Sequence, residues 1–344
     1  MTSSMSPFYG LRVGLAAFAC VLSCCAGAQA QTLKSVKDRG TLACGVSQGI
    51  AGFSIQTSGQ YAGFDVDFCR ALAAAIFDDP TKVTYVALST DERFRALKSG
   101  TIDVLSRNSS WAISRELEFG ITFPAVTFYD GQGFIVRKTR NVTSALDLGG
   151  SKVCVQPGTT TALNLSDYFK LNGMNFEAVS VAGPEEAAKA YDAGRCEVLT
   201  SDASQLHALR LTVSKPADHV ILADVISKEP LGPAVRDNDA QWINIVKWVH
   251  YGMVNAEELG ITSKNVDAAL SSSKPDVKRL VGTENDFGPK LGLTKDWVVR
   301  VLKSVGNYRE VYERNLGTGS QLAIPRGINQ LWTAGGIMYA PPIR

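Results

Sequence analysis

The segments Thr41-Leu-Ala-Cys-Gly-Val46 and Phe64-Asp-Val-Asp-Phe-Cys-Arg-Ala-Leu-Ala-Ala-Ala-Ile76 decide the fold class. The first is a short apolar run typical of a buried strand. The second has helical spacing, with Asp65 placed to cap the helix. Strands at 83–88 and 102–105 enclose a helix at 92–99, which Gly100 ends. This β-α-β-α-β order predicts a mainly parallel sheet with helices on both faces.

The same order recurs in the second half of the chain. Strands are expected at 152–156, 176–181 and 197–200, with helices at 162–171 and 185–193 between them.

Two Gly-rich stretches beside this second unit are expected to be crossovers between two lobes. They are Tyr129-Asp-Gly-Gln-Gly133, which precedes a strand at 134–137, and Glu229-Pro-Leu-Gly-Pro233. Helical patterns at 240–254 and 298–305 would complete the first lobe. We therefore predict an α/β fold with 31–131 and 232–344 as lobe 1 and 132–231 as lobe 2. The ligand cleft would lie between the lobes, at the carboxyl ends of their strands.

Composition limits the possible functions. Of 344 residues, 45% are apolar and 20% charged, which is enough apolar material for the cores of two domains. The formal net charge is +2 and no basic block with interleaved aromatic residues occurs, so nucleic acid is not expected as a partner.

The segment 1–30 has the pattern of a secretory signal peptide. Arg12 precedes a run of small and apolar residues, and the segment ends in Ala28-Gln-Ala30, a small-x-small cleavage pattern. The alternatives are an ordinary N-terminal helix and a lipoprotein site at Cys24, which the bulky Leu22 disfavours. We predict export to the periplasm without a lipid anchor.

Export makes disulfides the expected state of the cysteines. Three of the seven cysteines lie in 1–30, which leaves Cys44, Cys69, Cys154 and Cys196. Spacing alone permits three pairings. The lobe assignment favours Cys44 with Cys69 and Cys154 with Cys196, because a bridge between lobes would obstruct their movement. None of the three histidines has metal-ligand spacing with a cysteine, so neither a metal site nor a cofactor is predicted.

Three segments follow strands at the predicted cleft: 106–115, 157–161 and Ser201-Asp202. The hydroxyl-rich start of a helix offers N–H groups to an anion, and an Arg offers a two-pronged fork to a carboxylate. An Asp accepts hydrogen bonds from an ammonium group. Together these groups are suited to a zwitterion.

Six motifs, in order through the mature chain, carry a family resemblance. They are Gly63-Phe-Asp-Val-Asp-Phe-Cys-Arg-Ala, Asp103-Val-Leu-Ser-Arg-Asn, Tyr129-Asp-Gly-Gln-Gly-Phe, Gly158-Thr-Thr-Thr, Ile226-Ser-Lys-Glu-Pro-Leu-Gly-Pro and Leu331-Trp-Thr-Ala-Gly-Gly-Ile-Met-Tyr-Ala-Pro-Pro. The chain resembles the periplasmic polar amino-acid binding proteins of ABC transporters, solute-binding family 3, and within them the general L-amino-acid-binding proteins. The resemblance implies a two-lobed periplasmic binding protein-like (type II) fold that captures L-amino acids by hinge closure and delivers them to an ABC permease.

The resemblance also implies a set of ligand-binding residues. The carboxylate-binding Arg falls on Arg115 and the ammonium-binding Asp on Asp202. Hydroxyl and amide contacts fall on Asn108, Ser110 and Thr160. Further candidates for the cleft are Gly158, Thr159, Gln156, Trp111 and Phe53. The two threonines at 159 and 160 are also ordinary N-cap residues.

The chain departs from the family pattern at several positions. Ala112 replaces a residue that is usually a hydroxyl residue, and Ser47 and Ile50 fall where many relatives place an Asp and an aromatic residue over the ligand side chain. Phe53 is the aromatic residue that remains there. This less specialised wall suggests broad specificity.

We therefore predict a binding protein that acts as a monomer, and we do not expect an enzyme. No nucleophile-elbow Gly-x-Ser-x-Gly with a Ser-His-Asp order is evident. A dehydratase-like enzyme and a soluble amino-acid sensor on the same fold stay open as alternatives, because fold alone does not determine function.

Overall fold

The computed structural model describes residues 1–4 and 31–344. Residues Gln31–Arg344 form one compact unit. The predicted signal peptide lies almost entirely outside the described residues. Among the helices that are described, none has the length and apolar character needed to cross a membrane.

A six-stranded sheet organises the first lobe. Its strand order is β4-β1-β5-β13-β6, and β7 also pairs with β13. The strands are β1 (Leu42–Ser47), β4 (Val83–Leu88), β5 (Val104–Ser110), β6 (Ile121–Thr122), β7 (Phe128–Asp130) and β13 (Glu229–Arg236). The strand β1 runs parallel to β4 and β5, whereas β13 is antiparallel to its neighbours.

A second, five-stranded sheet has the order β10-β9-β11-β8-β12. Its strands are β8 (Gln132–Arg137), β9 (Lys152–Val155), β10 (Glu177–Ser180), β11 (Val198–Asp202) and β12 (His219–Ile221). The three strands β10, β9 and β11 are parallel, and β8 is antiparallel to β11 and β12. The two sheets confirm the predicted two-lobed α/β fold. A small hairpin pairs β2 (Ile55–Thr57) with β3 (Gln60–Ala62).

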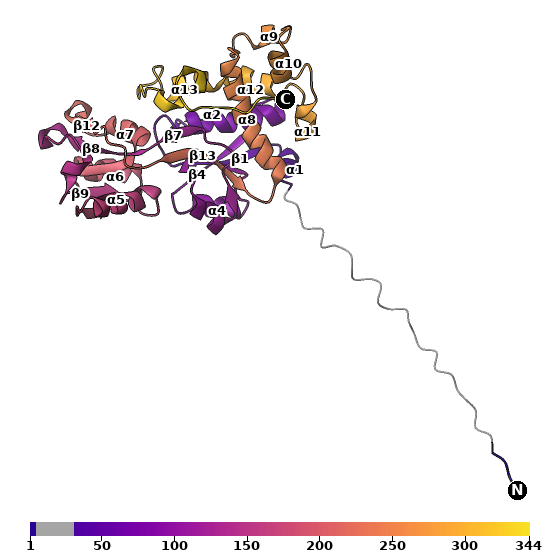
Figure 1. The fold of residues 1–344 in the computed structure, drawn as a ribbon, viewed down its shortest axis with the longest axis horizontal. Coiled ribbons are helices and arrows are strands. Elements are labelled where there is room, and N and C mark those ends of the chain that lie inside the picture. Colours follow the sequence, from indigo (N-terminus) through magenta and orange to yellow (C-terminus); the bar gives the residue numbers. More distant parts are fainter. Residues whose placement is uncertain (5–30) are drawn as a thin grey trace. The chain divides into compact units, whose positions relative to one another are not determined.

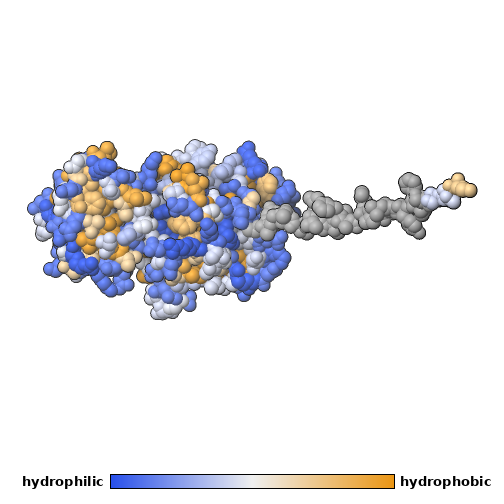
Figure 2. Space-filling model, turned by 90° about the horizontal axis from the view of Figure 1, so that it is seen from below, coloured by the Kyte–Doolittle hydropathy of each residue, from blue (hydrophilic) through white to orange (hydrophobic). Residues whose placement is uncertain are grey.

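Helices cover both faces of both sheets (Figure 1). With the first sheet lie α1 (Thr32–Arg39), α2 (Phe64–Phe77), α3 (Arg93–Lys98), α4 (Ile113–Phe119), α8 (Ala240–Glu258), α9 (Val266–Ala269), α10 (Pro275–Val281), α11 (Phe287–Leu291), α12 (Trp297–Val305) and α13 (Tyr308–Asn315). With the second sheet lie α5 (Thr160–Leu171), α6 (Pro184–Asp192) and α7 (Ala203–Arg210). Seen from below, the surface is hydrophilic with separate apolar patches (Figure 2).

The chain passes between the two sheets twice, and the two passages lie side by side. The first joins β7 to β8 through Gly131, and the second joins β12 to β13. Glu229 at the start of β13 pairs with Asp130 at the end of β7. A Cβ atom at Gly131 would lie 2.8 Å from the carbonyl oxygen of Ser227, so a glycine allows this close approach of the two passages.

Two expectations about local structure are wrong. Residues 106–110, expected as a loop, continue β5 to Ser110. Asp65 does not cap α2: the N-cap is Gly63, which has no side-chain cap. In each case a neighbouring strand or a distant polar group provides the hydrogen bonds, and a local pattern does not contain that information.

Each lobe contains one disulfide. Cys44 of β1 is bonded to Cys69 of α2, and Cys154 of β9 is bonded to Cys196, two residues before β11. Both bridges therefore join a strand to a neighbouring segment of the same lobe. The predicted pairing is confirmed.

Candidate functional site

A polar cavity lies between the two lobes and is lined from both. The first lobe contributes Ile50, Thr90, Arg93, Arg107, Asn108, Ser110 and Arg115. The second lobe contributes Gln156, Thr159, Thr160, Thr161, Pro184, Thr200, Ser201, Asp202 and Gln205. Most of these residues come from strand ends and from the first turns of α3, α4, α5, α6 and α7, because parallel strands bring the following segments to one edge.

The lobes touch across this cavity. Gln156 Nε2 donates to Thr90 Oγ1 at 2.6 Å, and Asn108 Nδ2 donates to Gln205 Oε1 at 3.4 Å. In both pairs one residue belongs to each lobe. The structure therefore shows the two lobes closed on each other.

Arg115 is buried at the lobe 1 side of the cavity. Its guanidinium group donates to the carbonyl oxygen of Ser110 and lies 5.3 Å from the centre of the Phe94 ring. Burial lowers the pKa of Arg115, and the carboxylates of Glu229 and Asp202 oppose this shift. A planar guanidinium group held in this way presents further N–H donors to a carboxylate.

Asp202 lies on the opposite side, at the end of β11, and is also buried. Within the described part of the chain, no protein donor hydrogen bonds to its carboxylate. Burial raises the pKa of Asp202 well above its ordinary value, and the neighbouring acids Asp130 and Glu229 raise it further. A buried carboxylate without a donor is costly, and a bound cation would relieve that cost.

Glu229 is a polar residue of the site that the sequence analysis missed. Its carboxylate is buried and accepts hydrogen bonds from Thr160 Oγ1 at 2.9 Å, Asn164 Nδ2 at 2.7 Å and Ser227 Oγ at 2.8 Å, and also from Ser110 Oγ. Two of the hydroxyl groups predicted to contact ligand thus bind Glu229 in this state. The residue lies in the Lys-Glu-Pro-Leu-Gly-Pro motif, which was a signal that could have identified it.

Several predicted residues lie at the cavity, in different roles. Asn108, Ser110, Gln156, Thr159 and Thr160 line it together with the predicted charged pair. Thr159 is the N-cap of α5: its Oγ1 accepts from the backbone N–H of Ala162 at 3.2 Å. This geometry leaves the first turn of α5 facing the cavity.

Two predicted aromatic residues do not line the cavity, and Gly158 lies beside it. Phe53 is fully buried in the lobe 1 core, and the centre of its ring lies 5.7 Å from the centre of the Phe128 ring. Trp111 is 42% exposed and packs on Phe123, because β5 continues past the cavity and carries it outward. A Cβ at Gly158 would lie 3.0 Å from Asp91 Oδ1, so this glycine is where the lobes meet closely.

Arg93 and Arg107 are two charged residues of the cavity that the sequence analysis also missed. Arg107 lies within the segment 106–115, and Arg93 begins a helix at the carboxyl edge of the sheet. Their positions relative to the strands could therefore have indicated that both residues lie at the cavity. Arg107 donates to the carbonyl oxygen of Leu88 at 3.0 Å and to Thr90 Oγ1 at 3.3 Å. Burial lowers the pKa of Arg107 to about 10, and Asp65 opposes this shift.

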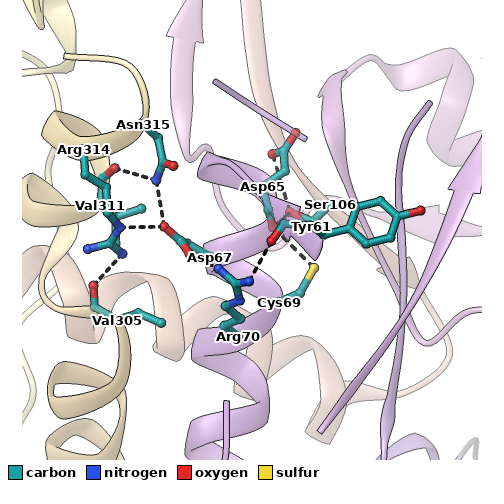
Figure 3. A network of polar contacts seen from close by, with 10 residues as sticks. All are labelled: Tyr61, Asp65, Asp67, Cys69, Arg70, Ser106, Val305, Val311, Arg314 and Asn315. Carbon is teal, nitrogen blue, oxygen red and sulfur yellow. Dashed lines mark hydrogen bonds and ion pairs between the residues drawn. The ribbon is translucent and has the colours of Figure 1, made fainter. Parts of the chain in front are cut away.

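A network of polar contacts surrounds Asp65 and Asp67 of α2 (Figure 3). Asp65 Oδ2 accepts from the backbone N–H of Asn108 at 2.9 Å, and Ser106 Oγ donates to the backbone oxygen of Asp65 at 3.0 Å. Asp67, two residues further along α2, accepts from Arg314 Nε at 2.8 Å and from Asn315 Nδ2 at 2.7 Å. The two acids therefore connect α2 to β5 and to α13.

We predict that Asp65 makes the stability of the ligand-free protein depend on pH. Burial raises the pKa of Asp65 to about 7, from an ordinary value of 3.8, against the opposing effects of Asn108, Arg107 and Ser106. Between those pH values the folded chain binds a proton at Asp65 and the unfolded chain does not. Raising the pH through this range therefore lowers the free energy of unfolding, by an amount on the order of 4 kcal/mol.

The measurement is urea unfolding of the wild type and Asp65→Asn at pH 5 and pH 7.5. An amide oxygen can keep the bond from the N–H of Asn108, and its NH2 group can donate to Ser106 Oγ, so the variant retains the network. The wild type should lose stability relative to Asp65→Asn as the pH rises. Equal pH dependence of the two proteins would contradict the prediction.

Comparisons with known proteins identify the family. The model of the bacterial extracellular solute-binding proteins, family 3, matches residues 42–279. The chain belongs to this family. It is 56% identical over 320 residues to the general L-amino acid-binding periplasmic protein AapJ of Rhizobium johnstonii, covering 92% of this chain and 94% of that protein.

Two further relatives agree with this assignment. The glutamate/glutamine/aspartate/asparagine-binding protein BztA of Rhodobacter capsulatus is 48% identical, with 98% of this chain and 99% of that protein covered. An ABC transporter periplasmic binding protein from Brucella ovis, solved with glutathione bound, is 50% identical with a TM-score of 0.90 and covers 92% of this chain and 100% of that one.

The family membership settles the general role of the chain. It is an extracytoplasmic solute-binding protein, as the sequence analysis predicted. These relatives are described as binding proteins and not as enzymes, which agrees with the predicted absence of catalysis. The family also confirms the predicted type of two-lobed fold.

Proposed function

We propose that the protein captures L-amino acids by their backbone charges and delivers them to an ABC permease. The observation that carries the proposal is that Arg115 and Asp202 line one cavity from opposite lobes. Arg115 would pair with the α-carboxylate and Asp202 with the α-ammonium group, so the two ends of the zwitterion would hold the two lobes together. The relatives named above bind amino acids or are described as bound to glutathione, whose glutamyl end carries the same two charged groups.

Closure of the lobes is part of this proposal. The two passages of the chain at Gly131 and before Glu229 are the natural hinge, because few residues there need to change conformation. An amino acid would bind one lobe first and then the other, and the permease would recognise the closed form. The predicted lobe boundaries at 131/132 and 231/232, the export signal at 1–30 and the monomeric state belong to the same proposal.

The experiment is titration calorimetry on protein unfolded and refolded to remove bound ligand. Several L-amino acids with different side chains should bind, whereas their N-acetyl and amide derivatives should bind weakly or not at all. Blocking either end leaves one buried charge without its partner, which commonly costs about 2 to 5 kcal/mol. Unchanged affinity for an N-acetylated amino acid would remove Asp202 from the site.

A further inference from the structure

The backbone of Tyr129, just before the first passage between the lobes, is held by a single side-chain amide. In the described part of the chain, β7 pairs with β13, where Tyr129 lies opposite Pro230, a residue with no N–H to donate. The N–H of Tyr129 donates to Asn329 Oδ1 at 2.7 Å, and Asn329 Nδ2 donates to the carbonyl oxygen of Tyr129 at 2.9 Å. Asn329 therefore satisfies this edge of β7 as a neighbouring strand would.

Asn329 is itself fixed in place. It ends the short 3-10 helix η4 (Gly327–Asn329) and is 3% exposed. Arg326 Nη2 donates to the backbone oxygen of Asn329 at 2.9 Å. The same guanidinium group forms a two-pronged ion pair with Glu257 of α8, at 2.5 and 3.2 Å, and both side chains are buried. Because a bidentate pair has a defined geometry, it holds Asn329 in a fixed position relative to α8.

The contacts of the chain change from lobe 1 to lobe 2 directly after Tyr129. Before it, the hydroxyl group of Tyr308 in α13 donates to the carbonyl oxygen of Thr127 at 2.9 Å. After it, the carboxylate of Asp130 accepts from the backbone N–H of Ser204 at 3.3 Å, and Ser204 belongs to α7 of the second lobe. The bonds from Asn329 therefore mark the last point at which this passage is attached to lobe 1.

We propose that Asn329 is a positioning residue for lobe closure, because it fixes the lobe 1 end of the first passage. This inference rests on the proposed function, in which the lobes close about the two passages. Both Tyr129 and Asn329 belong to lobe 1, so closure and opening leave their two hydrogen bonds intact. Asn329 lies outside the set of described residues that line the cavity, so it acts on affinity through closure and not through contact with ligand.

The free energy of closure explains the expected effect. Without the amide of Asn329, the N–H and C=O groups of Tyr129 can bond to water in the open protein, and the residue can adopt more conformations. Closure must then order it. Ordering the backbone of one residue corresponds to about fivefold to thirtyfold in an equilibrium constant. Because a less favourable closure lowers the apparent affinity for any ligand, the loss should not depend on the ligand side chain.

The first test is calorimetry with L-alanine and L-glutamate on the refolded wild type, Asn329→Ala and the control Asn255→Ala. Asn255 Nδ2 donates to the carbonyl oxygens of Tyr251 at 2.8 Å and Pro341 at 3.0 Å, so the control also removes an amide that bonds to the backbone of lobe 1, but not at a passage. We expect Asn329→Ala to lose about fivefold to thirtyfold in affinity for both ligands. The control should change by less than about twofold.

The second test is hydrogen exchange of the ligand-free proteins, followed by mass spectrometry of their peptides. Peptides that cover residues 125–133 should exchange faster in Asn329→Ala than in the wild type, because the N–H of Tyr129 has lost its acceptor. Peptides that cover β4 should exchange at the same rate in all three proteins. This readout separates a local change at the passage from a general loss of stability.

Several outcomes would overturn the proposal. They are an unchanged affinity of Asn329→Ala, a loss of affinity without faster exchange at 125–133, an equal loss in Asn255→Ala, and an Asn329→Ala protein that is unfolded as a whole. A loss for one of the two ligands alone would also overturn it, because closure is common to both. A wild type that binds neither ligand would instead contradict the proposed function, while the exchange result would still test the attachment of Tyr129.

Discussion

Replacing Arg115 with alanine is expected to weaken the binding of every L-amino acid ligand by about thirtyfold to several thousandfold. Arg115 is buried at the cavity, and its removal would leave the α-carboxylate of the ligand without a charged partner in a closed space. Because the α-carboxylate is common to all amino acids, the loss should be similar for small and large side chains. Calorimetry with L-alanine and L-glutamate would measure it.

Replacing Asp202 on the opposite lobe with asparagine should weaken the binding of free L-amino acids by a comparable factor. Asp202→Asn keeps the shape of the side chain and removes the charge that would pair with the ammonium group. Its effect should be small for a ligand whose ammonium group is already acetylated, and large for the free amino acid.

Matched controls separate binding from folding in these variants. Arg115 also donates to Ser110 and packs on Phe94, so its removal can lower stability as well as affinity. Thermal unfolding of the ligand-free variants would report stability, and Arg95→Ala would report the effect of losing an exposed charge near the site. An Arg115→Ala protein that binds like the wild type would overturn the central assignment.

Removing the disulfide of the second lobe should destabilise the protein by about 4 kcal/mol. Cys154 and Cys196 are separated by 42 positions, and their bond limits the conformations of the unfolded chain over that loop. The variant is Cys154→Ala with Cys196→Ala, and urea unfolding of the ligand-free protein is the measurement.

The other disulfide provides the comparison. Cys44 and Cys69 are separated by 25 positions, so chain entropy predicts a slightly smaller loss for the corresponding double variant. Both cysteine pairs are fully buried, and alanine leaves each site apolar. An unchanged unfolding midpoint in both double variants would contradict the view that these bridges stabilise the lobes.

The order of strands and helices was predictable because it depends on local patterns. The strand at 83–88 was predicted with the bounds of β4, and the helix at 64–76 differs from α2 by one residue. Apolar residues recur every two positions in a strand and about every three and a half positions in a helix, and Gly often ends the element. These patterns reflect steric and burial preferences within one element. Where an element continued because of a distant partner, as at β5, the predicted bounds were wrong.

The sequence by itself determined the two α/β lobes, and it predicted charged groups suited to a zwitterion. For the four cysteines it favoured one of three pairings, which the structure then confirmed. Only the tertiary structure decided which side chains share the cavity. Arg93 and Asp202 are more than a hundred positions apart, as are Ser110 and Glu229, and no local spacing records that they meet. Their proximity follows from the packing of two sheets and the closure of two lobes, where burial makes each unpaired charge costly.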